Sequence, residues 1–339
     1  MMSKDLSKKI YYVTFILALF VIALHSSYLE LLNPELEGYD FSYISQRLLL
    51  VIGDAAVPTF FVISGYLLFT KFELKEYPRM LLSKVFSLVI PYFIWSIAAF
   101  IFMDFIFPLM KGGTIEVTFE SVVLDILLAR EYPHLWFIRP LLVFFICSPL
   151  LYFIFKYLKQ WSIFIPITLF FVYMFFRPDY GGILIWIPLF FIGSYLAYFK
   201  IPVMNKYKPR LISIFVIVLF LSLAVTFTLL HSNYEDYIYY VYRFFAPLLV
   251  WFSLDILTSL FNKEKIYEIF KTSGFIFFSH LFIVNGFKEL LQLGISANSN
   301  YNCALLFFLI YIISTSVTLL VTHLLKRFAN PVYKFIGGR

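Results

Sequence analysis

Charged side chains are scarce in this sequence. Asp, Glu, Lys and Arg together make up only 14% of its 339 residues, whereas an average soluble domain carries about 25%. Hydrophobic residues account for 62% of the chain and aromatic residues alone for 22%. This composition excludes a soluble globular domain and predicts an integral membrane protein.

Cysteine is almost lacking as well, and regular alternation of polar and apolar residues is absent. The two cysteines, Cys147 and Cys303, both lie in apolar runs, so no disulfide framework is indicated and both are predicted to be packing residues. Without alternating segments of about ten residues a transmembrane barrel is excluded. The membrane spans must therefore be helices.

Long apolar runs are what the sequence has in abundance. A helix needs about 20 apolar residues to cross the hydrocarbon core. Runs of roughly that length, separated by charged or Pro, Gly and Asn-containing turns, occur at about 10–29, 48–70, 82–107, 135–155, 161–176, 183–199, 211–230, 238–261, 273–292 and 303–325. We therefore predict an all-α, polytopic membrane protein, with residues 1–339 forming a single domain of about ten transmembrane helices.

The distribution of Lys and Arg predicts the orientation in the membrane. If the N-terminus is cytoplasmic, twenty of the 27 Lys and Arg residues fall in cytoplasmic segments, as the positive-inside rule requires. The sequence thus predicts cytoplasmic N- and C-termini in a multi-pass protein of the cell (cytoplasmic or inner) membrane. Because the cations are dispersed over short loops, the net charge of +7 indicates a membrane surface and no nucleic-acid partner.

Ionisable residues inside the spans are costly, which makes each of them a functional candidate. Counting along the helices places four of them in the outer third of the membrane and one nearer its middle. The outer four are His25, Asp54, Arg139 and Arg243, and the deeper one is His280. Asp104, Asp255, Lys288 and Glu289 lie near helix ends, where we expect them to extend to the headgroups. The outer four residues and His280 together predict either a charge network between helices or a water-accessible chamber in which a histidine can act as a base.

Several short strings resemble the acyltransferase type 3 family, and they occur in the family's order. They are VPTFFVISGYL at 57–67, IPY at 90–92, HLWF at 134–137 and FSH at 278–280. The resemblance implies a membrane-embedded core of about ten helices. It also implies an O-acyltransferase, typically an O-acetyltransferase, that modifies cell-surface or secreted carbohydrates.

The resemblance also implies roles for single residues. His25 matches the histidine regarded as the family's catalytic base, and His280 matches the histidine of a late helix. Lys84, seven residues before Pro91, stands where the family usually has an arginine on the cytoplasmic side. One position departs from the pattern, because Thr14 occupies the place of an arginine usually found eleven residues before the first histidine. Another cation would have to replace that arginine, or the donor chemistry differs.

The expected donor is acetyl-CoA or another acyl-CoA, which acts as a substrate; no permanently bound cofactor and no metal ion are predicted. The phosphates of the donor need cations on the cytoplasmic face. The densest basic group near a helix end comprises Lys71, Lys75, Arg79 and Lys84. These four residues are predicted to bind the donor, although positive-inside topology alone also explains them.

The expected acceptor is a hydroxyl of a surface polysaccharide or of a lipid-linked glycan. Such a hydroxyl is a weak nucleophile, so a general base must take its proton. We predict that His25 is that base, and depth alone suggests that Asp54 orients it. His280 is expected to orient the donor or to donate to its carbonyl oxygen.

The remaining polar residues of the spans are predicted to contact the substrates. Arg243 or Arg139 could stabilise the oxyanion. Trp136 and His134 are expected at the outer mouth, where the indole could stack on a sugar ring, although aromatic residues are common at that membrane level.

Two other interpretations remain open. A transporter or flippase for a lipid-linked saccharide would also contain buried charges and aromatic residues, but transporters often show inverted repeats, which we do not find in the sequence. The second interpretation is a catalytically inactive relative of the family, since Thr14 departs from the family pattern.

Overall fold

The computed structural model describes residues 4–32, 40–110, 112–115, 117–130, 132–176, 183–202, 210–229, 235–257 and 268–338. Within these ranges the secondary structure is entirely helical, as the sequence predicts. The first half of the chain contains α1 (Lys4–Ser26), α3 (Phe41–Asp54), α4 (Ala56–Phe69), α5 (Tyr77–Lys84), α6 (Ile90–Phe100), α7 (Phe107–Met110), α8 (Phe119–Leu127), α9 (Ile138–Ile146) and α10 (Ser148–Leu158). The second half contains α11 (Phe164–Phe176), α12 (Ile187–Tyr198), α13 (Arg210–Leu229), α14 (Glu235–Ser253), α16 (Ser273–Gln292), α17 (Asn300–Phe328) and α18 (Asn330–Phe335).

Several of these helices join into stretches long enough to cross a membrane. Among the described residues, 7 helical stretches have the required length and hydropathy. They are Lys4–Leu31, Phe41–Phe69, Leu74–Leu109, Ser148–Phe176, Leu211–Thr228, Ser273–Gln292 and Asn300–Phe328. Pro133–Ile146 and Ile183–Tyr198 are shorter apolar helices. The protein is therefore a multi-pass membrane protein.

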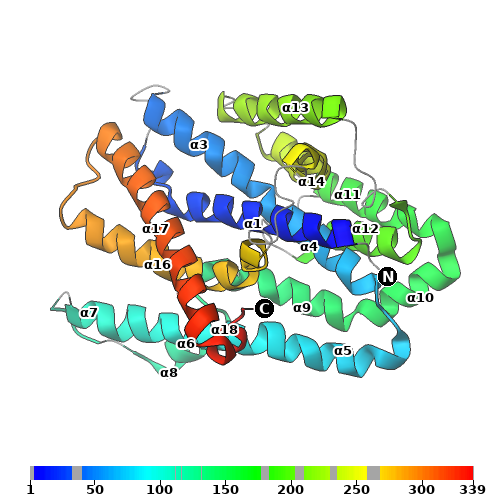
Figure 1. The fold of residues 1–339 in the computed structure, drawn as a ribbon, viewed down its shortest axis with the longest axis horizontal. Coiled ribbons are helices and arrows are strands. Elements are labelled where there is room, and N and C mark those ends of the chain that lie inside the picture. Colours follow the sequence, from blue (N-terminus) through cyan, green and yellow to red (C-terminus); the bar gives the residue numbers. More distant parts are fainter. Residues whose placement is uncertain are drawn as a thin grey trace.

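The structure divides two of the expected spans differently from the sequence. Helical residues continue through Ser148–Phe176, whereas the apolar pattern predicts 135–155 and 161–176. Lys159 has a φ of 50°, which an L-residue in a regular helix does not adopt, and the chain changes direction between α10 and α11 (Figure 1). The expected span 238–261 falls on α14 and on residues 258–261, which lie outside the described part of the chain.

The first helix lies at the centre of the bundle. In Figure 1, α1 runs through the middle of the molecule, with α13 on one side and α5, α6 and α7 on the other. Its apolar residues join those of α3, α13, α14, α16 and α17 in one buried cluster. A second buried cluster is formed mainly by α4, α6, α9 and α12. α4 and α16 contribute residues to both clusters, and α1 packs against both of these helices, so side chains on the three helices are well placed to line a site inside the bundle.

Helices α4 and α12 approach each other closely because each contributes a glycine at the contact. A Cβ atom on Gly65 would lie 2.2 Å from the Phe190 carbonyl oxygen, and one on Gly193 would lie 1.9 Å from the Val62 carbonyl oxygen. Atoms at such distances overlap, so no side chain fits there. Close packing of α4 against α12 thus explains Gly65, the glycine of the VPTFFVISGYL string.

We expect Gly193→Ala to destabilise the fold, because the two helix backbones would have to separate. Overpacking of this kind typically costs about 1–3 kcal/mol. The measurement is the fraction of protein that stays monodisperse in detergent after heating. Gly286→Ala on α16 is the matched control, since a Cβ there meets nothing within 4 Å. Equal heat resistance of the two variants would contradict this account of the contact.

Two residues expected to reach the headgroups are instead paired within the bundle. Asp255 is buried and forms a salt bridge with Lys9 of α1, whose ammonium also lies 4.1 Å from the Trp251 ring centroid. Lys288 donates a hydrogen bond to the Ser27 carbonyl oxygen, at 2.9 Å. Pairing removes the need to reach water, because each charge already has a polar partner.

Candidate active site

Three histidine side chains from distant parts of the chain meet inside the bundle. The ring centroids of His134 and His280 are 4.7 Å apart, those of His25 and His280 are 5.3 Å apart, and those of His25 and His134 are 6.2 Å apart. His134 and His280 are buried and His25 is partly buried. We call these three residues the histidine cluster. Among the described residues, no three His, Cys, Asp or Glu side chains are arranged to hold a metal ion.

Each histidine is positioned by a different element. His25 lies in the last turn of α1 and His280 in the first half of α16. His134 belongs to a 3-10 turn, Pro133–Phe137, that precedes α9. The turn is fixed to α16 by Tyr132, whose hydroxyl donates to the Phe278 carbonyl oxygen and accepts from the Phe282 backbone N–H, both at 2.9 Å.

The tautomer of His280 follows from its hydrogen bonds. Its Nδ1 lies 2.9 Å from the carbonyl oxygens of Ile276 and Phe277. A carbonyl oxygen can only accept, so Nδ1 carries the proton and Nε2 of the neutral ring has a free lone pair. This Nε2 atom is buried and has no hydrogen-bond partner among the described residues. His280 is therefore oriented to accept a proton or a hydrogen bond.

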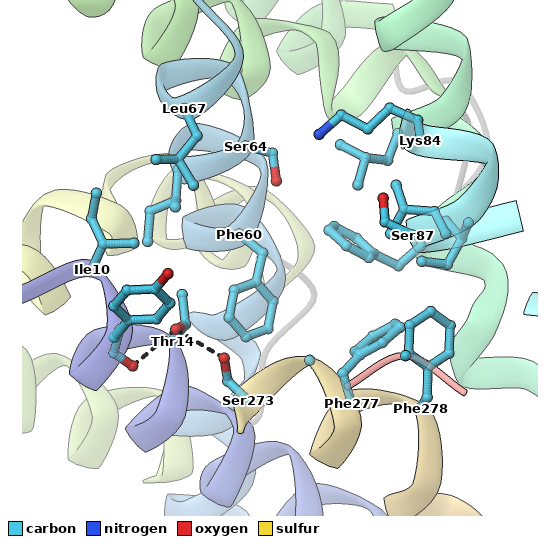
Figure 2. Close-up of a pocket in the computed structure, with 18 of the residues that line it drawn as sticks. Ile10, Thr14, Phe60, Ser64, Leu67, Lys84, Ser87, Ser273, Phe277 and Phe278 are labelled. Carbon is cyan, nitrogen blue, oxygen red and sulfur yellow. Dashed lines mark hydrogen bonds between the residues drawn. The ribbon is translucent and has the colours of Figure 1, made fainter. Parts of the chain in front are cut away.

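A cavity of about 240 Å³ lies between α1, α4, α9 and α16. Its lining is mostly apolar but includes Thr14, Ser64, Lys84, Ser87 and Ser273. We call it the lysine-side cavity. Figure 2 shows Lys84 extending across it toward Ser64 of α4. The Thr14 and Ser273 hydroxyls are 3.2 Å apart, which links α1 to α16 at its floor (Figure 2).

One phenylalanine, Phe277, lies between the lysine-side cavity and the histidine cluster. Phe137 and Phe277 both line the cavity, and their ring centroids are 5.7 Å apart. The Phe277 ring also lies 5.4 Å from that of His134 and 6.4 Å from that of His280. The cavity thus ends one aromatic ring away from the histidines.

Of the four basic residues predicted to bind the donor, the structure brings only Lys84 to the cavity. Its Nζ lies 4.6 Å from the Phe145 ring centroid. Lys71, Lys75 and Arg79 are exposed and do not line the cavity, and Lys75 and Arg79 form surface ion pairs with neighbouring glutamates. Their predicted contact with the donor stays a prediction.

A second cation at the cavity is Lys271, which the sequence analysis did not single out. Lys271 lines the cavity and pairs with Glu268 at 2.5 Å. Glu268 also pairs with Lys326 of α17 at 3.1 Å. Hydrogen bonds from these two lysines hold the pKa of the Glu268 carboxyl below its usual value. Glu268 thus stays ionised and keeps Lys271 at this end of the bundle.

Asp54 and Arg243 form a separate cluster with each other. The Arg243 guanidinium donates to the Asp54 carboxylate at 2.8 Å, and the Tyr239 hydroxyl donates to the same carboxylate. Both partners lie on α14, so these contacts join α3 to α14. The contacts found for Asp54 and Arg243 hold these two helices together. We predicted that Asp54 orients His25 and that Arg243 stabilises the oxyanion, and both roles stay predictions.

Trp136 and Arg139 follow His134 along the chain but point elsewhere. The half-buried indole of Trp136 packs against that of Trp186, at 5.5 Å between ring centroids. Arg139 is exposed and interacts electrostatically with Tyr92. Their expected contacts with substrate stay predictions. His134, expected beside Trp136 at the outer mouth, lies in the histidine cluster, and its expected contact with substrate also stays a prediction.

These features define a class: a multi-pass helical membrane protein with a lysine-lined cavity next to a cluster of histidines inside the bundle. A family model described as an acyltransferase domain (Acyl_transf_3) matches residues 10–327. The chain therefore belongs to this family, which confirms the resemblance seen in the sequence, and the protein is a membrane acyltransferase. No curated protein and no solved structure matches the chain.

Proposed function

We propose that this protein is an O-acyltransferase that moves an acyl group, typically acetyl, from cytoplasmic acyl-CoA to a hydroxyl of an extracytoplasmic surface glycan or its lipid-linked precursor. The observation that supports this most is the order of parts along the bundle. A cavity lined by two lysines lies one aromatic ring, that of Phe277, away from the histidine cluster. A donor with an anionic head and an apolar arm fits that order.

The proposed topology has cytoplasmic N- and C-termini and about ten membrane crossings in the cell membrane. It rests on the positive-inside distribution of Lys and Arg. With this orientation Lys84 and Lys271 face the cytoplasm, where acyl-CoA is found. The eleven residues from Thr14 to His25 rise by about 16 Å, so the extended arm of the donor would cover most of the distance to the histidines, provided that the Phe277 ring turns aside.

The transfer step balances with one histidine acting as a base and then as an acid. His25 takes the proton of the acceptor hydroxyl as its oxygen attacks the thioester carbonyl carbon. The new C–O bond forms, the C–S bond breaks, and the proton passes to the departing CoA thiolate. His280, fixed by its Nδ1–H, can accept a hydrogen bond from His25 or from the acceptor through Nε2.

We propose that Lys84 and Lys271 bind the donor phosphates. Both line the cavity in which Thr14 stands, so they supply the positive charge that an arginine at position 14 would provide. The more exposed Lys71, Lys75 and Arg79 would contribute a weaker, screened attraction.

Lys84→Glu is expected to raise the KM for acetyl-CoA by about tenfold or more, because it replaces a charge-assisted contact to phosphate by repulsion. Initial rates of CoA release by the purified protein in nanodiscs measure it. Arg79→Glu, the same charge reversal at an exposed position outside the cavity, is the matched control and should change the KM less than threefold. If both variants raise the KM equally, the lysine-side cavity is not the phosphate site.

The acceptor side of the proposal is tested in cells. A strain that lacks the gene should regain ester-linked acetate on its surface glycans when the wild-type gene is returned, as measured by NMR of the isolated polysaccharides. If the glycans carry the same acetate with and without the gene, the proposed acceptor class is wrong.

A further inference from the structure

A second cavity, of about 410 Å³, lies at the opposite end of α1 and α16. Its lining comprises Ser27, Tyr28, Glu30, Leu31, Phe102, Met103, Phe107, Asn285, Lys288, Glu289 and Gln292. We call it the amide-side cavity. Nothing in the function proposed above assigns a role to it.

The two cavities lie on either side of the histidine cluster. Helices α1 and α16 run parallel, because Thr14 contacts Ser273 and Ser27 contacts Lys288. Along each helix a residue of the lysine-side cavity comes first, the histidine follows, and a residue of the amide-side cavity comes last. A hydroxyl delivered through the amide-side cavity would thus reach the histidines from the side opposite the donor.

We propose that the amide-side cavity binds the acceptor, and that this acceptor is an uncharged, polyhydroxylated molecule such as a neutral saccharide. The proposal rests on the acyl-transfer function inferred above and deepens it by naming the acceptor site and its charge class. If acyl transfer does not occur, the assignment falls with it.

The polar groups of the cavity suit hydroxyls. The amide of Asn285 is only partly buried and supplies both a donor and an acceptor. Gln292 donates to the Tyr28 hydroxyl at 3.1 Å, which leaves its amide oxygen able to accept. Phe102 and Phe107 add apolar faces against which a sugar ring can pack. Mixed amides and aromatic rings match the alternating polar and apolar faces of a saccharide.

The charges of the cavity disfavour an anionic acceptor. Two carboxylates, Glu30 and Glu289, line it together with one ammonium, Lys288. Lys288 donates to the Ser27 carbonyl oxygen at 2.9 Å, and its ammonium lies 4.9 Å from the Tyr28 ring centroid. Two carboxylates against one ammonium give the lining a formal charge of one negative unit, which disfavours a uronate or phosphate group.

The cavity begins close to the proposed base along the chain, although His25 is not part of its lining. Ser27 is two residues from His25, and Lys288 interacts electrostatically with His25. The hydrogen bond from Lys288 to Ser27 holds the end of α1 against α16. A hydroxyl bound beside Ser27 would therefore lie within about one helical turn of His25 along the axis of α1.

The first test blocks the cavity without identifying the acceptor. In a Cys147→Ser, Cys303→Ala background that retains transfer, Asn285→Cys is labelled with 2-sulfonatoethyl methanethiosulfonate in native membranes. We expect labelling to reduce transfer of radiolabelled acetyl from acetyl-CoA to the endogenous glycans by about tenfold or more. Binding of acetyl-CoA to the purified labelled protein should stay unchanged, which locates the defect on the acceptor side.

Leu293→Cys is the matched control, because Leu293 is 85% exposed and lies at the end of the same helix outside the cavity lining. Labelling it should leave transfer intact. Full transfer by labelled Asn285→Cys would overturn the acceptor assignment while leaving the proposed function standing. If neither the wild-type protein nor the unlabelled background protein binds acetyl-CoA or transfers acetyl, the proposed function itself is wrong.

The second test addresses the charge class with two soluble probes. Methyl β-D-glucoside should inhibit transfer to the endogenous glycans at concentrations at least about tenfold lower than glucuronate does, since only the latter is repelled. Glu289→Gln should reduce that difference. Equal inhibition by the two probes, or by neither, would contradict the assignment of a neutral saccharide.

Discussion

Replacing His25 with alanine is expected to reduce acyl transfer by about 10²–10⁴-fold, the usual contribution of a general base. Without the imidazole, the acceptor hydroxyl keeps its proton as it attacks and the transition state loses its main stabilisation. The measurement is ester-linked acetate on surface glycans in a strain that carries only the variant gene, determined by NMR. The protein level in the membrane is followed in parallel.

His323→Ala provides the matched control for this prediction. His323 lies on α17, is exposed, and is not one of the three clustered histidines, so its loss should leave acetate at the wild-type level. Wild-type acetate in the His25→Ala strain would show that this imidazole is not the base. If acetate is then lost in His280→Ala instead, the base role would move to His280, whose Nε2 is already oriented to accept.

Filling the lysine-side cavity should have an effect of similar size. Ser64→Trp places an indole in the space between α4 and Lys84 (Figure 2). The arm of the donor and the indole cannot occupy this space together, so we expect binding of acetyl-CoA to fall below detection and transfer to cease. Equilibrium binding of radiolabelled acetyl-CoA to the purified variant in nanodiscs measures the first effect.

Ser64→Ala at the same position separates blocking from loss of the hydroxyl. It removes the polar group and leaves the cavity open, so its donor affinity should lie within about threefold of wild type. Thermal unfolding of both variants checks that the fold survives. Normal donor binding by a folded Ser64→Trp protein would mean that the donor enters by another route.

The sequence predicted the features that depend on composition and on order along the chain. Apolar runs predicted a helical multi-pass protein, which the structure confirms, and the ordered strings predicted the acyltransferase family. The matches at His25, His280 and Lys84 selected residues that the structure places in the histidine cluster or at the cavity. The order of residues along the chain is enough for these predictions, because the position of a residue in a long helix fixes its depth along the helix axis.

The sequence could not predict which side of a helix each residue faces. Counting residues gave Asp54 and His25 similar depths, yet Asp54 faces α14 and pairs with Arg243. Depth along a helix says nothing about direction around it, and only the packing of neighbouring helices fixes that direction. The same limit explains why Lys271 was overlooked as a cavity residue.

His134 shows a second limit, which concerns irregular backbone. The apolar pattern predicts a span from about residue 135, whereas His134 and the residues that follow it to Phe137 form a 3-10 turn before α9. The turn is held by the hydrogen bonds of Tyr132 to α16. Those contacts join residues about 150 positions apart, and no local pattern signals them.

The central claim is that a donor from the lysine-lined end reaches the histidine cluster. Its most direct test is an electron cryo-microscopy structure of the wild-type protein with acetonyl-CoA, in which a methylene group between the sulfur and the carbonyl carbon replaces the thioester by a thioether ketone and prevents transfer. We predict density for the phosphates beside Lys84 and Lys271, for the arm through the cavity, and for the acyl carbonyl next to His25 and His280 with the Phe277 ring displaced. An analogue bound elsewhere, with Phe277 still closing the cavity, would contradict the claim.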